Sequence, residues 1–170
     1  MIMTHIRTPL NKYTFQSRKI REYVELWSNG KVLNLFAGMT PLSVNETRND
    51  IRKDMPADYH LDALEFVSKK IVTGFDTVVL DPPYSYRKSM EMYNGAVSSS
   101  FNQVKNELPR IMHEKGRVIT LGYHSVSMGK SRGFELEAVA VLSHGGAIHD
   151  TIISVERKTE NDGRCQGHCH

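Results

Sequence analysis

The segment FDTVVLDPPY, which spans residues 75–84, restricts the fold more than any other part of the sequence. Its first six residues are mostly apolar and β-branched, which is typical of a strand buried on both faces of a parallel sheet. Proline has no N–H to donate to a neighbouring strand, so the strand has to end at Asp81, directly before Pro82 and Pro83. The segment is therefore either a simple strand end or the floor of an active site.

Helical and strand-like periodicity alternate along the rest of the chain. The spacing of apolar residues predicts helices over residues 12–27, from residue 62 onward, and over residues 87–114 with a break near residue 95. Short apolar runs predict strands over residues 31–38, at the end of segment 40–51, and over residues 57–61, 75–80 and 116–123. Residues 134–158 alternate apolar and polar side chains around His144-Gly145-Gly146, which is typical of an antiparallel hairpin. This order predicts an α/β sandwich with a mostly parallel sheet and a C-terminal antiparallel hairpin.

Length and charge are typical of a single domain that is only mildly basic. The chain has 170 residues, and 22 basic against 19 acidic side chains give a formal net charge of +3, which permits phosphate contacts without requiring them. No apolar run reaches the ~20 residues of a membrane span. We expect a cytoplasmic protein without a membrane partner, with one domain over residues 1–158 and a polar, flexible tail over residues 159–170.

The two cysteines, Cys165 and Cys169, both lie in this tail. No disulfide framework is therefore expected in the domain, which suits a reducing cytoplasm. His168 and His170 are also metal-ligand types, but side chains so close in sequence cannot easily surround one tetrahedral ion. We predict no metal site.

Glycine and acidic residues follow the predicted strands. In open α/β sheets, ligands bind beyond the carboxyl ends of the strands. A glycine there lets the backbone approach a ligand, an acid after the second strand can accept from ribose hydroxyls, and an acid at a helix start can accept from an adenine amino group. The segment FAGMTPL has one glycine and lacks the G-x-G-x-x-G spacing, which disfavours a dinucleotide such as NAD. The pattern predicts a nucleoside pocket.

Four short segments, VLNLFAG, NDI, DALEF and DPPY, in this order, resemble the class I S-adenosylmethionine-dependent methyltransferases. The resemblance covers residues 12–157 and is strongest to the amino-methyltransferases with the motif [DNS]-P-P-[YFW], among them DNA adenine and cytosine amino-methylases and related RNA enzymes. It implies a Rossmann-like sandwich and S-adenosylmethionine as cofactor. It also implies methyl transfer to an exocyclic amino group of a nucleic-acid base, and adenine in DNA is the favoured acceptor. An RNA adenine or guanine methyltransferase and a non-catalytic methyltransferase-like binding subunit are the alternatives.

The resemblance also implies roles for individual residues. It places the cofactor against Tyr13, Phe15, Phe36, Ala37, Gly38, Asp50, Ile51, Asp62, Ala63 and Asp81. It assigns catalysis to Asp81, Pro82, Pro83 and Tyr84. The Asp81 carboxylate and a proline carbonyl would accept the hydrogens of the target amino group, and Tyr84 would stack on the base.

The chain departs from the family pattern after its first strand. Met39-Thr40-Pro41 stands where a second glycine is usual, and only about a dozen residues separate Gly38 from Asp50, too few for the usual helix. These departures leave open how the methionine carboxylate is held, and they make Glu46 an alternative to Asp50 for the ribose. Asp62 has an alternative role as a helix cap.

The chain has no room for a separate recognition domain. We therefore expect a nucleic-acid partner, and DNA is favoured over RNA. Sequence specificity is expected to be weak, or to come from a homo-oligomer or a separate specificity partner. Two basic clusters, Arg87-Lys88 and Lys130-Arg132, follow predicted strand ends and are candidates for phosphate contacts.

Overall fold

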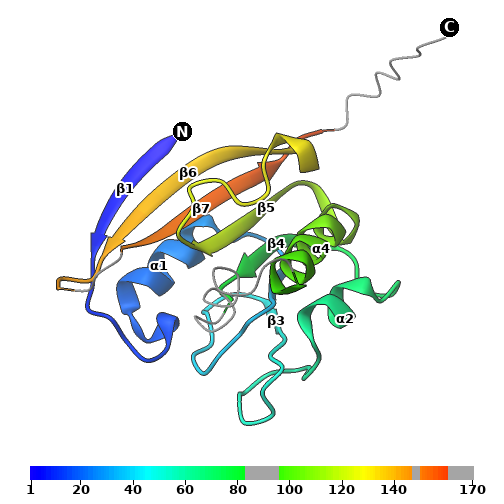
Figure 1. Ribbon diagram of the computed structural model, residues 1–170, viewed down its shortest axis with the longest axis horizontal. Coiled ribbons are helices and arrows are strands. Elements are labelled where there is room, and N and C mark those ends of the chain that lie inside the picture. The colour runs from blue at the N-terminus through cyan, green and yellow to red at the C-terminus, as the bar shows by residue number, and fades with distance from the viewer. Residues whose placement is uncertain (83–95, 147–149, 161–170) are drawn as a thin grey trace, which may run out of the picture.

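A seven-stranded sheet forms the centre of the computed structural model, which describes residues 1–82, 96–146 and 150–160. The strands are β1 (Ile2–Arg7), β2 (Val32–Asn34), β3 (Glu46–Arg48), β4 (Phe75–Leu80), β5 (Met112–Gly122), β6 (Phe134–Ser143) and β7 (Thr151–Lys158). Their spatial order is β1-β6-β7-β5-β4-β2-β3 (Figure 1). β7 is antiparallel to both of its neighbours, and the other pairs are parallel. The predicted parallel sheet with a C-terminal antiparallel hairpin is confirmed.

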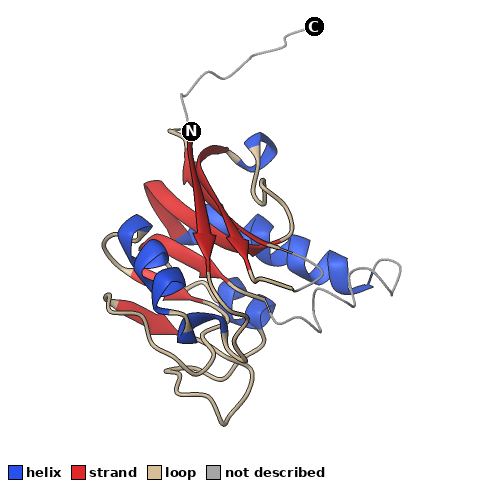
Figure 2. Ribbon diagram, turned by 90° about the vertical axis from the view of Figure 1, so that its left-hand side faces the viewer, coloured by secondary structure: helices blue, strands red, loops and turns tan. Residues whose placement is uncertain are grey.

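Helices cover both faces of the sheet (Figure 2). The 3-10 turn η1 (Thr14–Gln16) and helix α1 (Arg18–Trp27) pack on one face. Helices α2 (Ala63–Ser68) and α4 (Ala96–Ile111) pack on the other. A second 3-10 turn, η2 (Lys130–Arg132), precedes β6. The result is the three-layer arrangement expected of an α/β fold.

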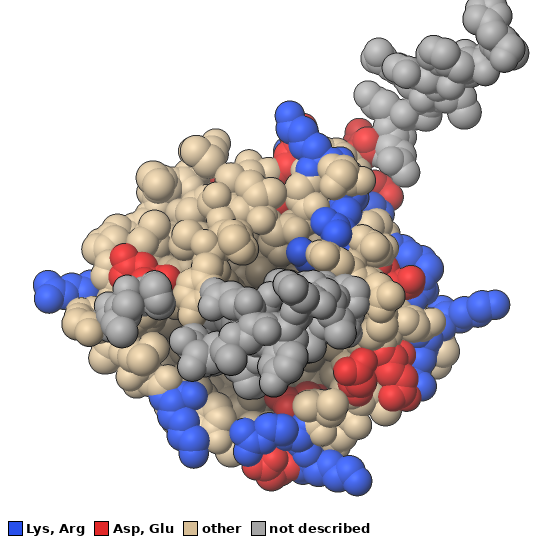
Figure 3. All heavy atoms as spheres, viewed as in Figure 1, with Lys and Arg blue, Asp and Glu red and all other residues tan. Residues whose placement is uncertain are grey.

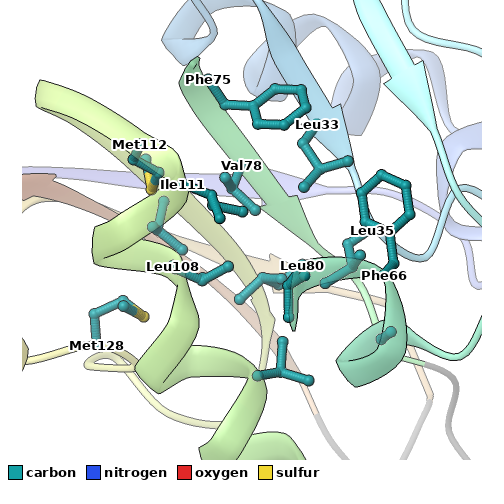
Figure 4. Packing of buried hydrophobic residues seen from close by; sticks show 14 of the residues in the cluster. Leu33, Leu35, Phe66, Phe75, Val78, Leu80, Leu108, Ile111, Met112 and Met128 are labelled. Atoms are coloured by element: carbon teal, nitrogen blue, oxygen red, sulfur yellow. The ribbon is translucent and has the colours of Figure 1, made fainter. Parts of the chain in front are cut away.

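Aliphatic side chains of the central strands form the core beneath α2 and α4. Leu33, Val78 and Leu80 point from β2 and β4 toward Phe66 of α2 and Leu108 of α4 (Figure 4). All five are at most 2% exposed. Burying a side chain of this size contributes about 1.5–3 kcal/mol, so this cluster fixes the helices against the central strands whose ends carry the candidate site.

Strand β1 was not predicted. It pairs in parallel with β6, from Ile2 opposite Ala138 to Arg7 opposite Ser143, and so extends the sheet at its edge. An edge strand buries few side chains, and most of those of β1 are exposed. Its sequence therefore lacks the apolar alternation by which strands are recognised.

Two predicted helix boundaries are wrong. The helix predicted over residues 87–114 ends at Ile111, because Met112 already pairs with Phe75 of β4. The Lys158 ammonium donates to the carbonyls of Pro109 and Met112 at 3.0 and 3.2 Å and so satisfies the end of the helix. The helix predicted over residues 12–27 begins only at Arg18, and residues 83–95 lie outside the described part of the chain.

The strand predicted over residues 57–61 is reduced to one bridge between Asn49 and Tyr59. Backbone bonds join only its middle to β3 and the residues after it, from the Asp58 and Tyr59 N–H groups to the Arg48 carbonyl and from the Asp50 N–H to the Tyr59 carbonyl. Its end is bonded by the Asn49 side chain instead, whose amide accepts from the Leu61 N–H at 3.2 Å and donates to the Leu61 carbonyl at 3.0 Å. The end of this segment still reaches the sheet edge where Asp62 was expected.

The basic cluster Lys130-Arg132 does not lie at the carboxyl edge of the sheet. It directly precedes β6, and Phe134, the first residue of β6, pairs with Lys158, the last residue of antiparallel β7. The cluster therefore lies at the amino edge, so its predicted position is wrong. Arg87-Lys88 lies outside the described residues. Within the described ranges, no helix is long and apolar enough to cross a bilayer.

An ion pair links β5 to β6 across β7. The guanidinium of Arg117 donates to Glu137 at 2.6 Å, and its centre lies 5.6 Å from the Trp27 ring of α1. The hydrogen bond from Arg117 lowers the pKa of the Glu137 carboxyl. Because the folded pKa is lowered, the stabilisation is present above the unfolded pKa and is lost as the pH falls through the folded pKa.

We predict that Glu137→Gln lowers the free energy of unfolding at neutral pH by about 0.5–1 kcal/mol. The difference from the parent should shrink as the pH is lowered from about 5 to about 3, through the range in which a glutamate titrates. Urea denaturation at several pH values measures both effects. Glu135→Gln, an exposed acid on the same strand, is the matched control. A Glu137→Gln deficit that stays constant down to the lowest pH would contradict the electrostatic origin.

Candidate active site

A cavity of about 870 Å³ opens at the carboxyl edge of the sheet. The loops that follow the strands gather at this edge, on the lower side of Figure 2. The cavity is lined by the loop before α1, by the segments after β2 and β3, by the start of α2 and by the ends of the strands β4 to β7. Ligand pockets commonly enclose about 300–1,000 Å³, so this cavity can hold a nucleoside-sized ligand together with a second reactant.

The structure brings together all the residues predicted to contact a cofactor. The cavity is lined by Tyr13, Phe15, Phe36, Ala37, Gly38, Asp50, Ile51, Asp62, Ala63 and Asp81, and by Pro82 of the predicted catalytic set. Pro83 and Tyr84 lie outside the described residues.

The turn after β2 is held by an acid from the segment that follows β3. The Gly38 N–H donates to Asp50 Oδ2 at 2.8 Å. Gly38 has φ +61°, in the left-handed region that favours glycine, and a Cβ added there would meet no atom within 4 Å. The backbone at this turn is therefore open to close approach by a ligand.

Asp50 and Glu46, the two alternatives for the ribose, have different surroundings. Asp50 lines the cavity, and its Oδ1 also accepts from the Arg52 N–H at 3.0 Å. Glu46 accepts from the Leu42 N–H at 3.0 Å and from the Asn34 amide at 3.1 Å, and its side chain is 6% exposed. Glu46 is not among the residues that line the cavity. This geometry favours Asp50 as the acid that faces a ligand.

Arg48 lies behind the turn and was not singled out by its sequence. Its guanidinium donates to Glu46 at 2.6 Å and to four backbone carbonyls, those of Ala37, Gly38, Thr40 and Pro56. Glu46 and Arg48 are two residues apart in β3 and hence point to the same face of the strand. A glutamate and an arginine two residues apart in a short strand were the sequence signal from which an ion pair next to the site could have been predicted.

Asp62 has the capping role that was the alternative to adenine binding. Its Oδ1 accepts from the Leu64 and Glu65 N–H groups at 2.9 and 3.2 Å, as an N-cap residue does at a helix start. The same side chain lines the cavity. A carboxylate has about four acceptor positions on two oxygens, so capping α2 leaves capacity for a ligand.

Charged side chains lie at the entrance beside the loop before α1. Arg52 forms a bidentate ion pair with Asp54, which raises the pKa of Arg52 and lowers that of the Asp54 carboxyl. The Lys12 ammonium lies 5.3 Å from the centre of the Tyr13 ring. These groups make this side of the entrance polar.

The far side of the cavity is formed by the ends of β5, β6 and β7. His144 Nδ1 lies 3.3 Å from the Thr8 carbonyl, and its Nε2 lies 3.0 Å from the Thr151 hydroxyl. A carbonyl only accepts, so Nδ1 carries a hydrogen, and in the neutral ring Nε2 accepts from Thr151. Tyr123 lines the cavity nearby, at the end of β5. Sequence reasoning assigned His144 to the hairpin turn and missed its place in the cavity wall.

No protein-family model matches the sequence, and no curated protein matches it. Solved structures do match its fold. The N-methyltransferase NodS from Bradyrhizobium japonicum WM9 has a TM-score of 0.61 at 10% identity, over 89% of this chain and 100% of its own. The 1,6-didemethyltoxoflavin-N1-methyltransferase from Burkholderia thailandensis, solved with S-adenosylhomocysteine, has 0.59 at 11% identity, over 84% and 78%. TrmN from Thermus thermophilus has 0.54 at 16% identity, over 82% of this chain and 47% of its own. The chain has the Rossmann-like fold of class I methyltransferases.

We predict that Asp62→Ala lowers the free energy of unfolding by about 1 kcal/mol, because α2 loses its N-cap. Asp62→Asn should lower it by less, since the amide oxygen can accept the same two N–H groups. Urea denaturation of both variants measures the difference. Glu65→Ala, an acid in the first turn of the same helix, is the control. Equal losses for the Asp62 alanine and asparagine variants would contradict the capping geometry.

Proposed function

We propose that this chain binds S-adenosylmethionine in the cavity and transfers its methyl group to an exocyclic amino group of a nucleic-acid base, adenine in DNA. The observation that carries the proposal is that Asp81 and Pro82, from the end of β4, line the same cavity as Gly38, Asp50 and Asp62. The residues proposed for the reaction and those proposed to bind the cofactor therefore line one cavity.

The cofactor side of the cavity suits an adenosine. In this proposal Asp50 accepts from the ribose hydroxyls and Asp62 accepts from the adenine amino group; the support is that both residues line the cavity. Three apolar residues that line the cavity, Phe36, Ile51 and Ala63, supply surface against which the adenine ring can pack. The open backbone at Gly38 admits the chain that carries the sulfur. When bound, the sulfonium supplies an electrophilic methyl group.

Asp81 makes the target nitrogen a better nucleophile. The lone pair of an aromatic amino group is delocalised into its ring, and it has to localise on nitrogen to attack the methyl carbon. The Asp81 carboxylate and the Pro82 carbonyl each accept one amino hydrogen and favour that form of the nitrogen. Methylation would leave the positive charge on the nitrogen, and the electrons of the broken carbon–sulfur bond would stay on the sulfur as a neutral thioether. Asp81 is placed to hold the proton that nitrogen then releases.

Tyr84 is proposed to stack on the target base, which in a duplex has to be flipped out of the helix. The surface in Figure 3 carries basic and acidic side chains interspersed, with no one-sign patch among the described residues that it displays. A surface of mixed charge agrees with low sequence specificity, or with a homo-oligomer or separate partner that supplies specificity.

A small-molecule amine is the second candidate acceptor. The observation in its favour is that two solved N-methyltransferases, NodS and the 1,6-didemethyltoxoflavin-N1-methyltransferase, match most of their length to this chain. In that case the far wall with Tyr123, His144 and Thr151 would enclose the whole acceptor. The two candidates differ in whether nucleic acid becomes labelled.

We predict that the protein binds S-adenosylhomocysteine, the demethylated cofactor, and does not bind NAD, because the turn at Gly38 lacks the dinucleotide fingerprint. Isothermal titration calorimetry measures both. Asp62→Asn should weaken the binding by about 1–3 kcal/mol. The amide N–H of the asparagine would face the amino N–H of adenine, so that two donors would meet without an acceptor. A folded sample without heat on addition of S-adenosylhomocysteine would overturn the methyltransferase proposal.

We predict that Asp81→Ala leaves cofactor binding nearly intact and lowers turnover by about 100- to 1,000-fold, by analogy with the loss of one oxyanion-hole donor. Asp81→Asn should keep measurable activity, because one acceptor oxygen remains. Transfer of a labelled methyl group to DNA and RNA, followed by mass spectrometry of the nucleosides, measures rate, polymer and base together. Asp150→Ala, an exposed acid outside the cavity lining, is the control. Methylation by Asp81→Ala at the parent rate would disprove this mechanism.

A further inference from the structure

We propose that Arg48 is a positioning residue for cofactor binding: it fixes two peptide planes of the turn after β2 so that the Met39 N–H faces the carboxylate of the cofactor's amino-acid part. The inference rests on the proposed function. After β2 this chain lacks the second glycine and the helix that are usual in the family it resembles. Arg48 would take over their part in holding the turn.

The peptide between Ala37 and Gly38 is held from both sides. Its carbonyl accepts from Arg48 Nη2 at 3.2 Å, and its N–H donates to Asp50 Oδ2 at 2.8 Å. The carbonyl and the N–H of a trans peptide point in opposite directions. A cation on one side and an anion on the other therefore fix this plane.

The next peptide, between Gly38 and Met39, is oriented by the same guanidinium. The Gly38 carbonyl accepts from Arg48 Nη2 at 2.8 Å, so the Met39 N–H points away from Arg48. Met39 lines the cavity, and its N–H donates no hydrogen bond to any group in the described part of the chain. A backbone N–H without an acceptor at a turn of this kind can donate to an anionic oxygen.

Arg48 can hold the turn because its own position is fixed. Its Nε donates to the Pro56 carbonyl at 2.7 Å, and its Nη1 donates to Glu46 at 2.6 Å. Its Nη1 also reaches the Thr40 carbonyl at 3.4 Å, and its side chain is 10% exposed. A lysine would keep the charge but has a single nitrogen, which cannot reach these separate acceptors at once.

The test compares two ligands that differ in the carboxylate. S-adenosylhomocysteine carries the amino-acid part, and 5′-methylthioadenosine has the same thioether and adenosine without it. We expect Arg48→Lys to weaken S-adenosylhomocysteine binding by about 10- to 100-fold, the loss of one hydrogen bond to a charged group. Binding of 5′-methylthioadenosine should change by less than about threefold. Calorimetry measures both affinities, and thermal melting checks that the variant is folded.

Arg117→Lys is the matched control, because Arg117 is also a partly buried arginine paired with a glutamate and does not line the cavity. It should leave both affinities unchanged. Should Arg48→Lys fail to fold, Glu46→Gln decides: it loosens the anchor of Arg48 without entering the cavity, and it should shift the two affinities in the same selective way. Equal losses for both ligands would overturn the inference and leave the proposed function standing. A parent protein that binds neither ligand would overturn the proposed function itself.

Discussion

The candidate site is built around the buried guanidinium of Arg48, through its ion pair and its hydrogen bonds to the backbone. A charge with 8% of its residue surface exposed is costly unless it is paired and hydrogen-bonded. Glu46 supplies the opposite charge, and four carbonyls from two loops supply the remaining acceptors. The loops after β2 and β3, which line the cavity, are thereby joined to β3. Arg48 bonds these loops from one side, and Asp50 bonds the turn after β2 from the other.

The connection between β5 and β6 is organised in a similar way. Parallel strands are usually joined through a helix, yet residues 123–133 contain only the 3-10 turn η2. Glu156 of β7 is fully buried, and its carboxylate accepts from the N–H groups of Ser127, Met128 and Gly129 at 2.8–2.9 Å. One buried charge thus bonds several backbone groups of a loop. In both places a charged side chain from the sheet forms hydrogen bonds with several backbone groups of a loop.

Features that depend on local sequence could be predicted, and those that depend on distant partners could not. Proline at positions 82 and 83 ends β4 whatever surrounds it, and the glycine turn after His144 defines the hairpin. By contrast, the end of α4 depends on Lys158, which is remote in the sequence. The role of Arg48 depends on carbonyls, which every residue has and which leave no mark in the sequence. The cavity was therefore predictable from its acids, but the residue that shapes its turn was not.

The acids of the site show why a structural and a functional role can belong to one residue. Asp50 and Asp62 each accept two backbone N–H groups, and each lines the cavity. These bonds orient the carboxylates before a ligand binds, so that little side-chain entropy is lost on binding. An asparagine or serine can also cap a helix, but neither side chain is anionic. At Asp50 the turns use both carboxylate oxygens, whereas Asp62 accepts both N–H groups on Oδ1. The capping of α2 therefore does not by itself require a carboxylate at Asp62, and a ligand that donates hydrogen bonds would.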